Sequence, residues 1–294
     1  MTIKELFEPY LAHRAKEGNC PKTIEEHRRF LYGPIDQAVG HLNVDRTLTM
    51  IVRADLMEAG QRYGIYGSQR TVVYFRQLMQ YAKLLGLDIG LDWRDMKVPR
   101  VPNKRVEYLD PTELEKIRDC FDLSEDAGLR TRTLIEFMLG TGLRIGEACS
   151  VNIEHINPET KEMWFINVKT GEEETMILNE NIVDWLNLYI KSRKDDCPAL
   201  FVSGRSRLLP VSSRNYIRSK TKHLALNKRI AHHVFRRTCG TYLLQDKVDL
   251  QSVRDYLRHK SERTTLRYYI GVQKEMRRSI AEKVMGKFVS RPSA

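Results

Sequence analysis

Two adjacent tyrosines, Tyr268 and Tyr269, lie near the C-terminus in the stretch LRHKSERTTLRYYIG, which is crowded with Arg, Lys and His. A phenol at this place can serve as a packing residue, as a platform for base stacking or as a nucleophile. Because the pKa of an unperturbed phenol is near 10, only about 0.1% of it is ionised at neutral pH. A nucleophilic tyrosine therefore needs neighbours that stabilise the negative charge developing on the group it attacks.

Three further stretches carry side chains suited to such chemistry, and the first stretch adds a histidine nine residues before Tyr268. Taken singly, each has an ordinary interpretation. An arginine and a glutamate one helical turn apart form surface ion pairs in many proteins, and a lysine at the tip of a hairpin is usually solvated. The residues are Arg144 and Glu147 in GTGLRIGEA, Lys169 in VKTGEEE, His233 and Arg236 in HHVFRRT, and His259 in LRH.

In this order the residues resemble the pattern of the tyrosine recombinase family, also called the phage integrase or Xer/lambda-integrase family. That pattern runs Arg, a hairpin Lys, His-x-x-Arg, a His, and a Tyr nine residues later. The resemblance covers the whole chain and implies that Tyr268 is the nucleophile, since it follows His259 by nine positions. Side chains of adjacent helical residues point about 100° apart, so Tyr269 is expected to face elsewhere and pack.

The resemblance also implies a reaction, the site-specific cleavage and rejoining of DNA through a 3′-phosphotyrosine bond. Arg144 and Arg236 would bind the non-bridging phosphate oxygens, with His259 as a further donor. Lys169 would protonate the leaving 5′-oxygen, and His233 would relay the proton of the phenol. The phosphotyrosine keeps the energy of the broken bond and the cations do the work of a metal ion, so neither a cofactor nor a metal is expected.

The sequence departs from the family pattern at three places. LRH stands where LGH is usual, which puts Arg258 at the position of a small residue. Arg237 replaces a frequent second histidine. The hairpin reads KTGEEE instead of the basic form found in Xer proteins, and its glutamates weaken the case for Lys169 because they would repel DNA locally. Glu147 is expected to orient the helix that carries the first arginine.

Helices are expected to position most of these residues, so the predicted fold class is mainly α with a small antiparallel β-hairpin in the second half. Capping boxes at Thr2–Glu5, Thr23–Glu26 and Asp110–Glu113 predict three helix starts. Apolar residues at helical spacing predict further helices, and two short β-prone runs predict strands. The expected helices are 53–63, 68–85, 126–139, 180–194, 212–226, 233–245, 249–258 and a tail helix over 273–287, and the expected strands are 162–168 and 174–178.

A segment rich in Pro and basic residues divides the chain. It predicts a linker over 99–107 between a helical core-binding domain (1–98) and a mixed α+β catalytic domain (108–294). In the family that the chain resembles, two such domains close as a clamp around duplex DNA, and tetramers act on two DNA sites. The implied partners are double-stranded DNA and further copies of the chain, which is compatible with a monomer in solution. The tail helix is a candidate for exchange between subunits.

Positive charge is concentrated in the last third of the chain. Residues 201–294 carry 22 Lys/Arg against 6 Asp/Glu, a net charge of +16, whereas residues 101–200 are net −8. A solvated basic surface explains a modest excess, but this density of like charge repels itself unless a polyanion neutralises it. Nucleic acid is the candidate polyanion. The stretches expected to contact phosphates are 205–209, 214–223, 227–233 and 274–279.

The composition argues against several other classes of protein. The five cysteines are odd in number, far apart and without a CxxC pair, which disfavours a disulfide framework and a zinc site and favours a reducing cytoplasm. No apolar run approaches the roughly 20 residues that span a bilayer. The N-terminus mixes acidic and apolar residues, unlike a secretory signal.

Three alternatives stay open at this point. A type IB topoisomerase shares the chemistry but relaxes supercoils without pairing two sites. A catalytically inactive DNA-binding protein would keep the fold, although all six positions of the catalytic pattern are filled. A nucleic-acid-binding module of unrelated fold would make the spacing of His259 and Tyr268 a coincidence. Within the recombinase interpretation, the chain suits either a mobile-element integrase or a Xer-type resolvase of chromosome or plasmid dimers.

Overall fold

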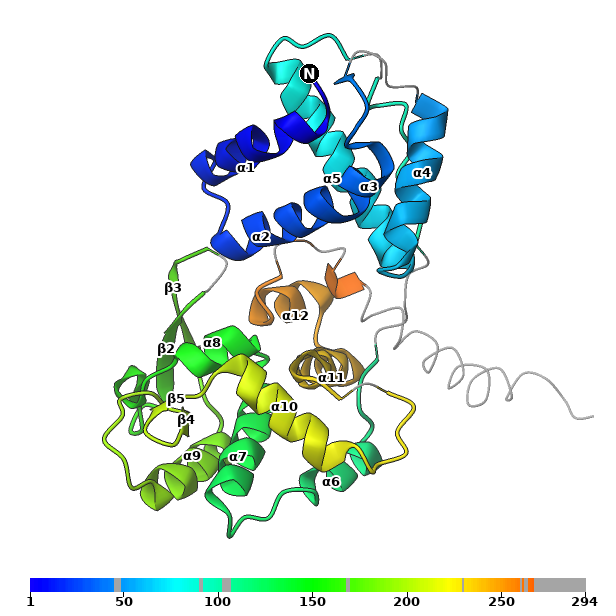
Figure 1. Ribbon diagram of the computed structural model, residues 1–294. Coiled ribbons are helices and arrows are strands. Elements are labelled where there is room, and N and C mark those ends of the chain that lie inside the picture. The colour runs from blue at the N-terminus through cyan, green and yellow to red at the C-terminus, as the bar shows by residue number, and fades with distance from the viewer. Residues whose placement is uncertain are drawn as a thin grey trace, which may run out of the picture. The chain divides into compact units, whose positions relative to one another are not determined.

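The computed structural model describes residues 1–44, 49–89, 92–101, 107–167, 170–228, 230–259, 261 and 264–266. The chain divides into two compact units, Met1–Lys104 and Arg105–Ala294 (Figure 1). Each unit encloses its own hydrophobic core. Across the part of the chain that the structure describes, no helix combines the length and the apolar character needed to cross a bilayer.

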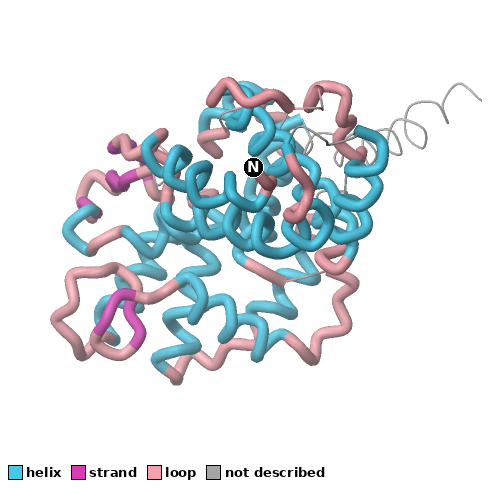
Figure 2. Tube along the Cα trace, turned by 45° about the horizontal axis from the view of Figure 1, so that its top comes forward, coloured by secondary structure: helices cyan, strands magenta, loops and turns pink. Residues whose placement is uncertain are grey.

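Unit 1 consists of helices joined by loops over its described residues (Figure 2). The predicted helix over 68–85 is confirmed as α5, and its apolar stripe from Val72 to Ala82 is fully buried. The predicted helix over 53–63 corresponds to α4, which begins four residues earlier. In chain order the elements are η1 (Lys4–Leu6), α1 (Phe7–Lys16), α2 (Pro21–Phe30), η2 (Leu31–Ile35), α3 (Asp36–Val39), α4 (Thr49–Gln61) and α5 (Ile65–Leu84).

Two predicted helix starts in unit 1 differ from the structure. The capping box at Thr23–Glu26 is wrong, because α2 already begins at Pro21 with Cys20 in the extended conformation before it. Proline is suited to the first position of a helix, since its φ is already helical and it lacks the N–H that would go unsatisfied there. At the N-terminus half of the predicted box forms, since the N–H of Thr2 donates to Glu5 Oε2 at 2.8 Å.

Unit 2 combines helices with two small antiparallel sheets, which confirms the predicted fold class. β1, β4 and β5 were not predicted, because a strand of two residues is too short to show an alternating pattern. The elements are α6 (Pro111–Arg118), α7 (Asp126–Thr141), α8 (Ile145–Ser150), η4 (Ile153–His155), β1 (Ile156–Asn157), β2 (Glu162–Ile166), β3 (Glu173–Ile177), α9 (Glu180–Ser192), β4 (Val202–Ser203), β5 (Ser206–Arg207), α10 (Pro210–Thr221), α11 (His232–Gln245) and α12 (Leu250–Tyr256).

The end of α10 corrects another prediction. The helix was expected to continue to residue 226 but ends at Thr221. Leu224 and Leu226 both pack against the core of the unit. Residues two positions apart do not share a face of an α-helix, so the chain must leave the helix before both can pack against the core.

The two predicted strands are confirmed as β2 and β3, which form an antiparallel hairpin with β1 on the other edge of β2. β2 buries Met163 and Phe165 and turns Glu162 and Ile166 outward, as expected of a strand with one covered face. In the register of the pair, Phe165 lies opposite Glu174 on β3. The strand pairing thus brings an aromatic core residue and a carboxylate to the same point of the hairpin.

α7 is the central helix of unit 2 and packs against α9, α11 and α8. Its residues Leu134, Ile135, Phe137 and Met138 are buried around most of its circumference, so this helix is a core element. The ring of Phe137 meets that of Phe201 edge to face, with centroids 5.6 Å apart. Because α7 is held on several sides, its C-terminal end is a rigid place from which to present a turn.

The capping box predicted at Asp110 is confirmed at the start of α6. The N–H of Glu113 donates to Asp110 Oδ1 at 2.9 Å, and the N–H of Asp110 donates to Glu113 Oε2 at 2.9 Å. Pro111 occupies the first helical position. These contacts satisfy two donors that would otherwise have no partner at the helix start.

The substitution Asp110→Ala is expected to destabilise α6 by about 1 kcal/mol, because the N–H of Glu113 loses its acceptor. Hydrogen exchange of the α6 amides should then be about fivefold less protected. Asp119→Ala is the matched control at the other end of the helix, where a carboxylate makes no favourable interaction with the helix dipole. Equal loss of protection in both variants would contradict the role of the capping box.

Candidate active site

A tight turn after α7 forms one wall of the site. Gly142 ends the helix in the left-handed region, with φ of +60°, and its N–H donates to Met138 O at 3.0 Å. A Cβ on this residue would lie 2.6 Å from Leu257 Cδ2. Glycine is therefore required twice, for the backbone conformation and for the close approach of the segment that follows α12.

Arg144 directly follows this turn and precedes α8. Its N–H donates to Glu147 Oε2 at 2.7 Å and its Nη1 donates to Glu147 Oε1 at 2.6 Å. The side chain of Glu147 is fully buried, whereas that of Arg144 keeps 28% of its surface exposed. The pair is therefore more than a surface ion pair, because a buried carboxylate fixes the backbone and the guanidinium of one arginine.

Arg236 reaches the same turn from α11. It is 4% exposed, its Nη1 donates to Gly142 O at 2.5 Å, and its Nη2 donates to Leu257 O. Hydrogen bonds from a charged donor to carbonyl oxygens are among the stronger ones in proteins. The guanidinium thus joins the end of α7 to the end of α12.

The segment after α12 adds His259 and a strained backbone. Arg258 has φ of +52°, a left-handed conformation that costs a residue with a Cβ about 1 kcal/mol. Its carbonyl oxygen accepts from Arg144 Nη2 at 3.2 Å. His259 Nδ1 lies 2.9 Å from Thr265 Oγ1, and Thr265 is fully buried. Burial first, and then Arg236, Arg144 and Arg258, lower the pKa of His259 to about 4.

The first turn of α11 carries two histidines with different surroundings. His232 is buried, its Nε2 lies 3.0 Å from Ser213 Oγ, and burial lowers its pKa to about 4. His233 lies at the surface, and partial desolvation together with Arg237, Arg236 and Arg144 lowers its pKa. Both imidazoles are therefore neutral at pH 7 beside guanidiniums that stay charged.

Four of the six predicted catalytic residues come together in one cluster. Contacts with the Gly142 turn and the 257–259 segment hold the two arginines. His259 belongs to that segment, and His233 lies on α11 three residues before Arg236. Lys169 and Tyr268 lie outside the described residues, as does the predicted tail helix. Such a cluster of fixed cations and neutral imidazoles can bind a tetrahedral oxyanion and exchange protons with it.

Several residues of the site were missed by the sequence analysis. Thr265 is six residues beyond His259 and has no pattern of its own, and the carbonyl oxygens that bind the arginines belong to the backbone and leave no sequence signal. His232 directly precedes the predicted His233, and the sequence does not show that His232 is the buried one of the two. Glu174 is one of three glutamates in the predicted hairpin, and nothing in the sequence indicates its pairing with Arg258.

The described residues contain no group of three His, Cys, Asp or Glu side chains that could hold a metal ion. All five cysteines are free, and the two buried ones have raised thiol pKa values because of burial, about 12 for Cys149 and about 11 for Cys239. Thiols with such pKa values are poor nucleophiles at neutral pH. Cys149 and Cys239 are therefore core residues.

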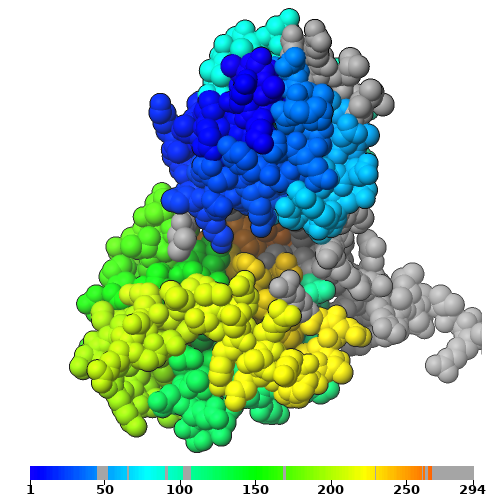
Figure 3. Space-filling view, in the orientation of Figure 1, coloured from blue at the N-terminus to red at the C-terminus, as the bar shows by residue number. Residues whose placement is uncertain are grey.

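A stripe of cations runs along α10, which packs against α8. Arg214, Arg218 and Lys222 recur every four residues and are exposed, while Ser213, Ile217 and Thr221 face inward. The yellow area of Figure 3, which includes α10, forms much of the visible surface of unit 2. The stripe borders a pocket of about 500 Å³ lined by Arg214, Asn215, Arg218, Thr221, Lys222, Leu224, Leu226, Lys228, Ile230 and Ala231.

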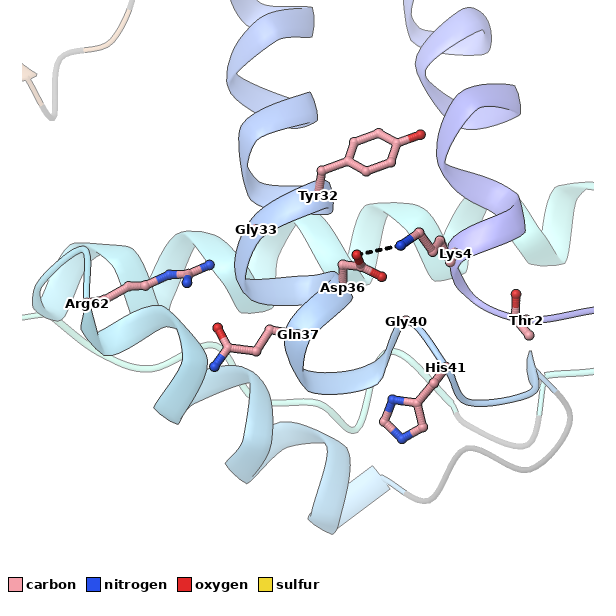
Figure 4. Close-up of a pocket in the computed structure, with 9 residues that line it drawn as sticks. All are labelled: Thr2, Lys4, Tyr32, Gly33, Asp36, Gln37, Gly40, His41 and Arg62. Atoms are coloured by element: carbon pink, nitrogen blue, oxygen red, sulfur yellow. Dashed lines mark hydrogen bonds and ion pairs between the residues drawn. The ribbon is translucent and has the colours of Figure 1, made fainter.

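Unit 1 has a polar pocket of similar volume, about 500 Å³ (Figure 4). Figure 4 shows Gln37 and Arg62 on one side of it and Lys4 on the other. Lys4 Nζ pairs with Asp36 Oδ2 at 2.8 Å, which joins the first helical turn to α3. The lining contains none of the predicted catalytic residues, and it comprises Thr2, Lys4, Tyr32, Gly33, Asp36, Gln37, Gly40, His41 and Arg62.

Comparison with known proteins identifies similar sequences. A family model described as the phage integrase family matches residues 107–276. Tyrosine recombinase XerA of Pyrococcus horikoshii is 25% identical over 280 residues, which cover 94% of this chain and 92% of that protein. Tyrosine recombinase XerC of Myxococcus xanthus is 29% identical over 183 residues, which cover 59% of this chain and 61% of that protein.

Comparison with solved structures identifies the fold. A structure of the Tn1549 transposon integrase in complex with a circular intermediate DNA superimposes with a TM-score of 0.75 at 18% identity, covering 95% of this chain and 99% of that one. A lambda integrase dimer bound to a core site gives a TM-score of 0.77 at 16% identity, covering 91% and 95%. At this level of identity the likeness establishes the fold alone.

Lowering the pH from 7 to 5 is expected to reduce the unfolding free energy of unit 2 by about 2 kcal/mol through His232 alone. The pKa of this imidazole is about 4 in the folded chain and about 6.5 when unfolded, so the unfolded chain binds more protons in this interval. Stability that is fully present above pH 6.5 is therefore lost as the pH falls toward 4.

Urea unfolding followed by tryptophan fluorescence measures this effect in a Trp93→Phe background, since Trp164 and Trp185 both lie in unit 2. His232→Gln should show a correspondingly weaker dependence on pH. A pH dependence that is identical in the two proteins would contradict the assignment.

Proposed function

The chain belongs to the phage integrase family of tyrosine recombinases, and on that premise we propose that it is a site-specific recombinase that cleaves and rejoins DNA through a 3′-phosphotyrosine intermediate. The observation that supports this most strongly is the cluster of Arg144, Arg236 and His259 around the Gly142 turn. Three separate segments of unit 2 converge there, and each contributes a donor suited to phosphate oxygens.

In the proposed cleavage, the phenol oxygen of Tyr268 forms a bond to the scissile phosphorus while the bond from phosphorus to the 5′-oxygen breaks. His233 accepts the phenol proton and Lys169 donates a proton to the 5′-oxygen, so protons and charge balance. The lowered pKa of His233 supports its part, because the neutral, proton-accepting form then predominates at neutral pH. The parts of Tyr268 and Lys169 rest on the family pattern.

Arg144 and Arg236 stabilise the charge that develops on the non-bridging oxygens. Guanidiniums stay protonated at every relevant pH, and these two are already held by a carboxylate and by carbonyl oxygens. Donors held before the reaction need no reorganisation in the transition state. We propose that these cations make a metal ion unnecessary and that the phosphotyrosine bond makes ATP unnecessary.

The proposed substrate is double-stranded DNA. The α10 stripe of Arg214, Arg218 and Lys222 supports this, since regularly spaced exposed cations bind a phosphate backbone without reading its sequence. We assign residues 108–294 as the catalytic domain, residues 1–98 as a core-binding domain and 99–107 as the linker. One structural neighbour is a lambda integrase tetramer bound to a Holliday junction. A tetramer on two DNA sites, assembled from monomers in the cytoplasm, is the corresponding proposal for this chain.

Two biological roles fit this chemistry, integration of a mobile element and Xer-type resolution of chromosome or plasmid dimers. The relatives include Xer recombinases, and the structural neighbours include a transposon integrase. The type IB topoisomerase and the inactive DNA-binding protein are not favoured, since the family match spans the catalytic pattern and four of its residues are assembled. A relaxation assay without a partner site distinguishes the topoisomerase activity.

The first test compares wild type, Tyr268→Phe and Tyr269→Phe on nicked suicide duplexes made from DNA flanking the gene, with EDTA present. A covalent protein–DNA adduct on denaturing gels is expected for wild type and for Tyr269→Phe, and it should be absent only for Tyr268→Phe. Peptide mapping then locates the linkage. An adduct on Tyr269 would refute the assignment of Tyr268, and tight binding without any adduct would favour the non-catalytic alternative.

The second test is Arg144→Lys, which keeps the charge beside Glu147 but loses the two-pronged guanidinium. Single-turnover cleavage of the same duplex is expected to slow by about 100-fold, in the range found for loss of one fixed donor to a developing oxyanion. DNA affinity should change little, because α10 keeps its cations. Lys191→Ala is the control, since it removes one exposed cation on α9. Equal rates for the two variants would count against a role of Arg144 in the transition state.

A further inference from the structure

Arg258 is unusual in its position in the family pattern and in its backbone conformation. It occupies the position where the resembled family usually has glycine, and its backbone keeps the left-handed conformation, φ +52°, that glycine adopts without strain. A strained backbone persists only where surrounding contacts compensate for it. The contacts of the Arg258 side chain are therefore expected to compensate for this strain.

The side chain folds back into unit 2 and is only 11% exposed. Its Cζ lies 4.9 Å from the centroid of the Phe165 ring. Its Nε lies 3.6 Å from Glu174 Oε2, and its Nη2 donates to Thr141 O at 3.4 Å, at the end of α7. One guanidinium thus contacts β2, β3 and the helix that leads into the Gly142 turn.

The two hairpin contacts belong to a single cross-strand pair. Phe165 and Glu174 face each other in the register of β2 and β3. The other oxygen of Glu174 accepts from Asn167 Nδ2 at 2.6 Å, and the N–H of Asn167 donates to Glu172 O at 2.9 Å. The guanidinium therefore binds the hairpin at the end where the two strands turn into each other.

Arg258 has both acidic and basic neighbours. Glu147 and Glu174 favour its charged form, whereas burial, the largest effect, and Arg144 lower its pKa. Tyr256 also faces it, from α12. A guanidinium starts from a pKa far above neutral and stays charged. Glu174, whose side chain keeps 27% of its surface exposed, is thus paired with a cation that offsets its negative charge.

We propose that Arg258 is a positioning residue that holds the β2–β3 hairpin against the arginine cluster, with Glu174 as its partner on the hairpin. Two departures from the family pattern, arginine for glycine in LRH and glutamate in the hairpin, then compensate each other. The proposal rests on the proposed function in one respect, because the hairpin is the segment that carries Lys169 in the sequence.

Fixing the hairpin matters for proton transfer. A general acid must lie within hydrogen-bonding reach of the oxygen it protonates, and a displacement of about 1 Å can slow a reaction about 100-fold. Arg258 joins the hairpin to the same segment whose carbonyl oxygen binds Arg144. The donor of the leaving-group proton and the arginine that binds the phosphate are then both held by the segment that contains Arg258.

The test uses two DNA substrates with the full-length protein. One has the normal 5′-oxygen at the scissile phosphate, and the other has a 5′-bridging sulfur. A thiol has a pKa near 8.5 and leaves without protonation, so it does not need the general acid. Variants are Arg258→Gly, which also relieves the backbone strain, Arg258→Lys, Glu174→Gln and the double variant Arg258→Gly/Glu174→Gln. Lys169→Ala and Arg144→Lys are the references.

Arg258→Gly is expected to slow cleavage at oxygen by 10- to 100-fold but cleavage at sulfur by no more than threefold, as Lys169→Ala should. Arg144→Lys should slow both. Arg258→Lys should recover part of the rate, and Glu174→Gln should add little to the loss in the double variant, because coupled residues are not additive. The melting temperature of Arg258→Gly is expected to stay near that of wild type.

Two results would overturn the proposal. If Arg258→Gly cleaves both substrates at the wild-type rate, Arg258 positions nothing. If it loses both substrates equally, its role is general stability of the unit. Failure of the wild-type protein to cleave either substrate while binding the DNA is a different outcome, because it refutes the proposed function itself, and this inference with it.

Discussion

Like charges do not stay close together without compensation, and the structure of unit 2 around the site is arranged to meet this constraint. Arg144 donates to the carbonyl oxygen of Arg258, and Arg236 donates to that of the preceding Leu257, so the three arginines occupy one region. Each is held by groups that the fold supplies. Arg144 donates to Glu147 and to a carbonyl, Arg236 donates to two carbonyls, and Arg258 forms an ion pair with Glu174 and donates to a carbonyl. Two of those carbonyls belong to Gly142 and Arg258, which both have a left-handed backbone, after α7 and after α12 respectively.

The positive charge of the cluster affects arginine and histidine side chains differently. A guanidinium keeps its charge beside other cations, because its pKa is too high for repulsion and burial to neutralise it. An imidazole loses its charge under the same conditions, and His233 and His259 both have lowered pKa values. The cluster therefore combines permanent positive charge, which attracts a phosphate, with neutral bases, which accept protons. A cluster of lysines and carboxylates could not keep these two properties apart so well at neutral pH.

The parts of the fold that sequence reasoning predicted are those with local signals. The capping box at Asp110 depends on residues three positions apart, and the stripe from Val72 to Ala82 repeats with the period of the helix, so both were readable. The predicted end of α10 is wrong because Leu224 and Leu226, both half-buried, pack against the core through tertiary contacts that no local pattern indicates. For the site, the family resemblance supplies six candidate residues, of which the structure describes Arg144, His233, Arg236 and His259. Their carbonyl partners belong to the backbone, and Thr265 lies six positions beyond His259 without a pattern of its own, so neither leaves a signal in the sequence.

Two departures from the family pattern, Arg258 and the hairpin glutamate Glu174, lie next to each other in the structure. Separately, an arginine in place of glycine suggests strain, and glutamates in a hairpin suggest repulsion of DNA. In the structure Arg258 and Glu174 are 84 positions apart in the sequence but 3.6 Å apart between Nε and Oε2, so their opposite charges offset each other. The pairing also explains why glycine is dispensable at this position: the guanidinium binds the aromatic ring of Phe165 and Glu174, contacts that glycine could not make. In this chain the contacts of the Arg258 side chain therefore join the β2–β3 hairpin to the segment that carries His259.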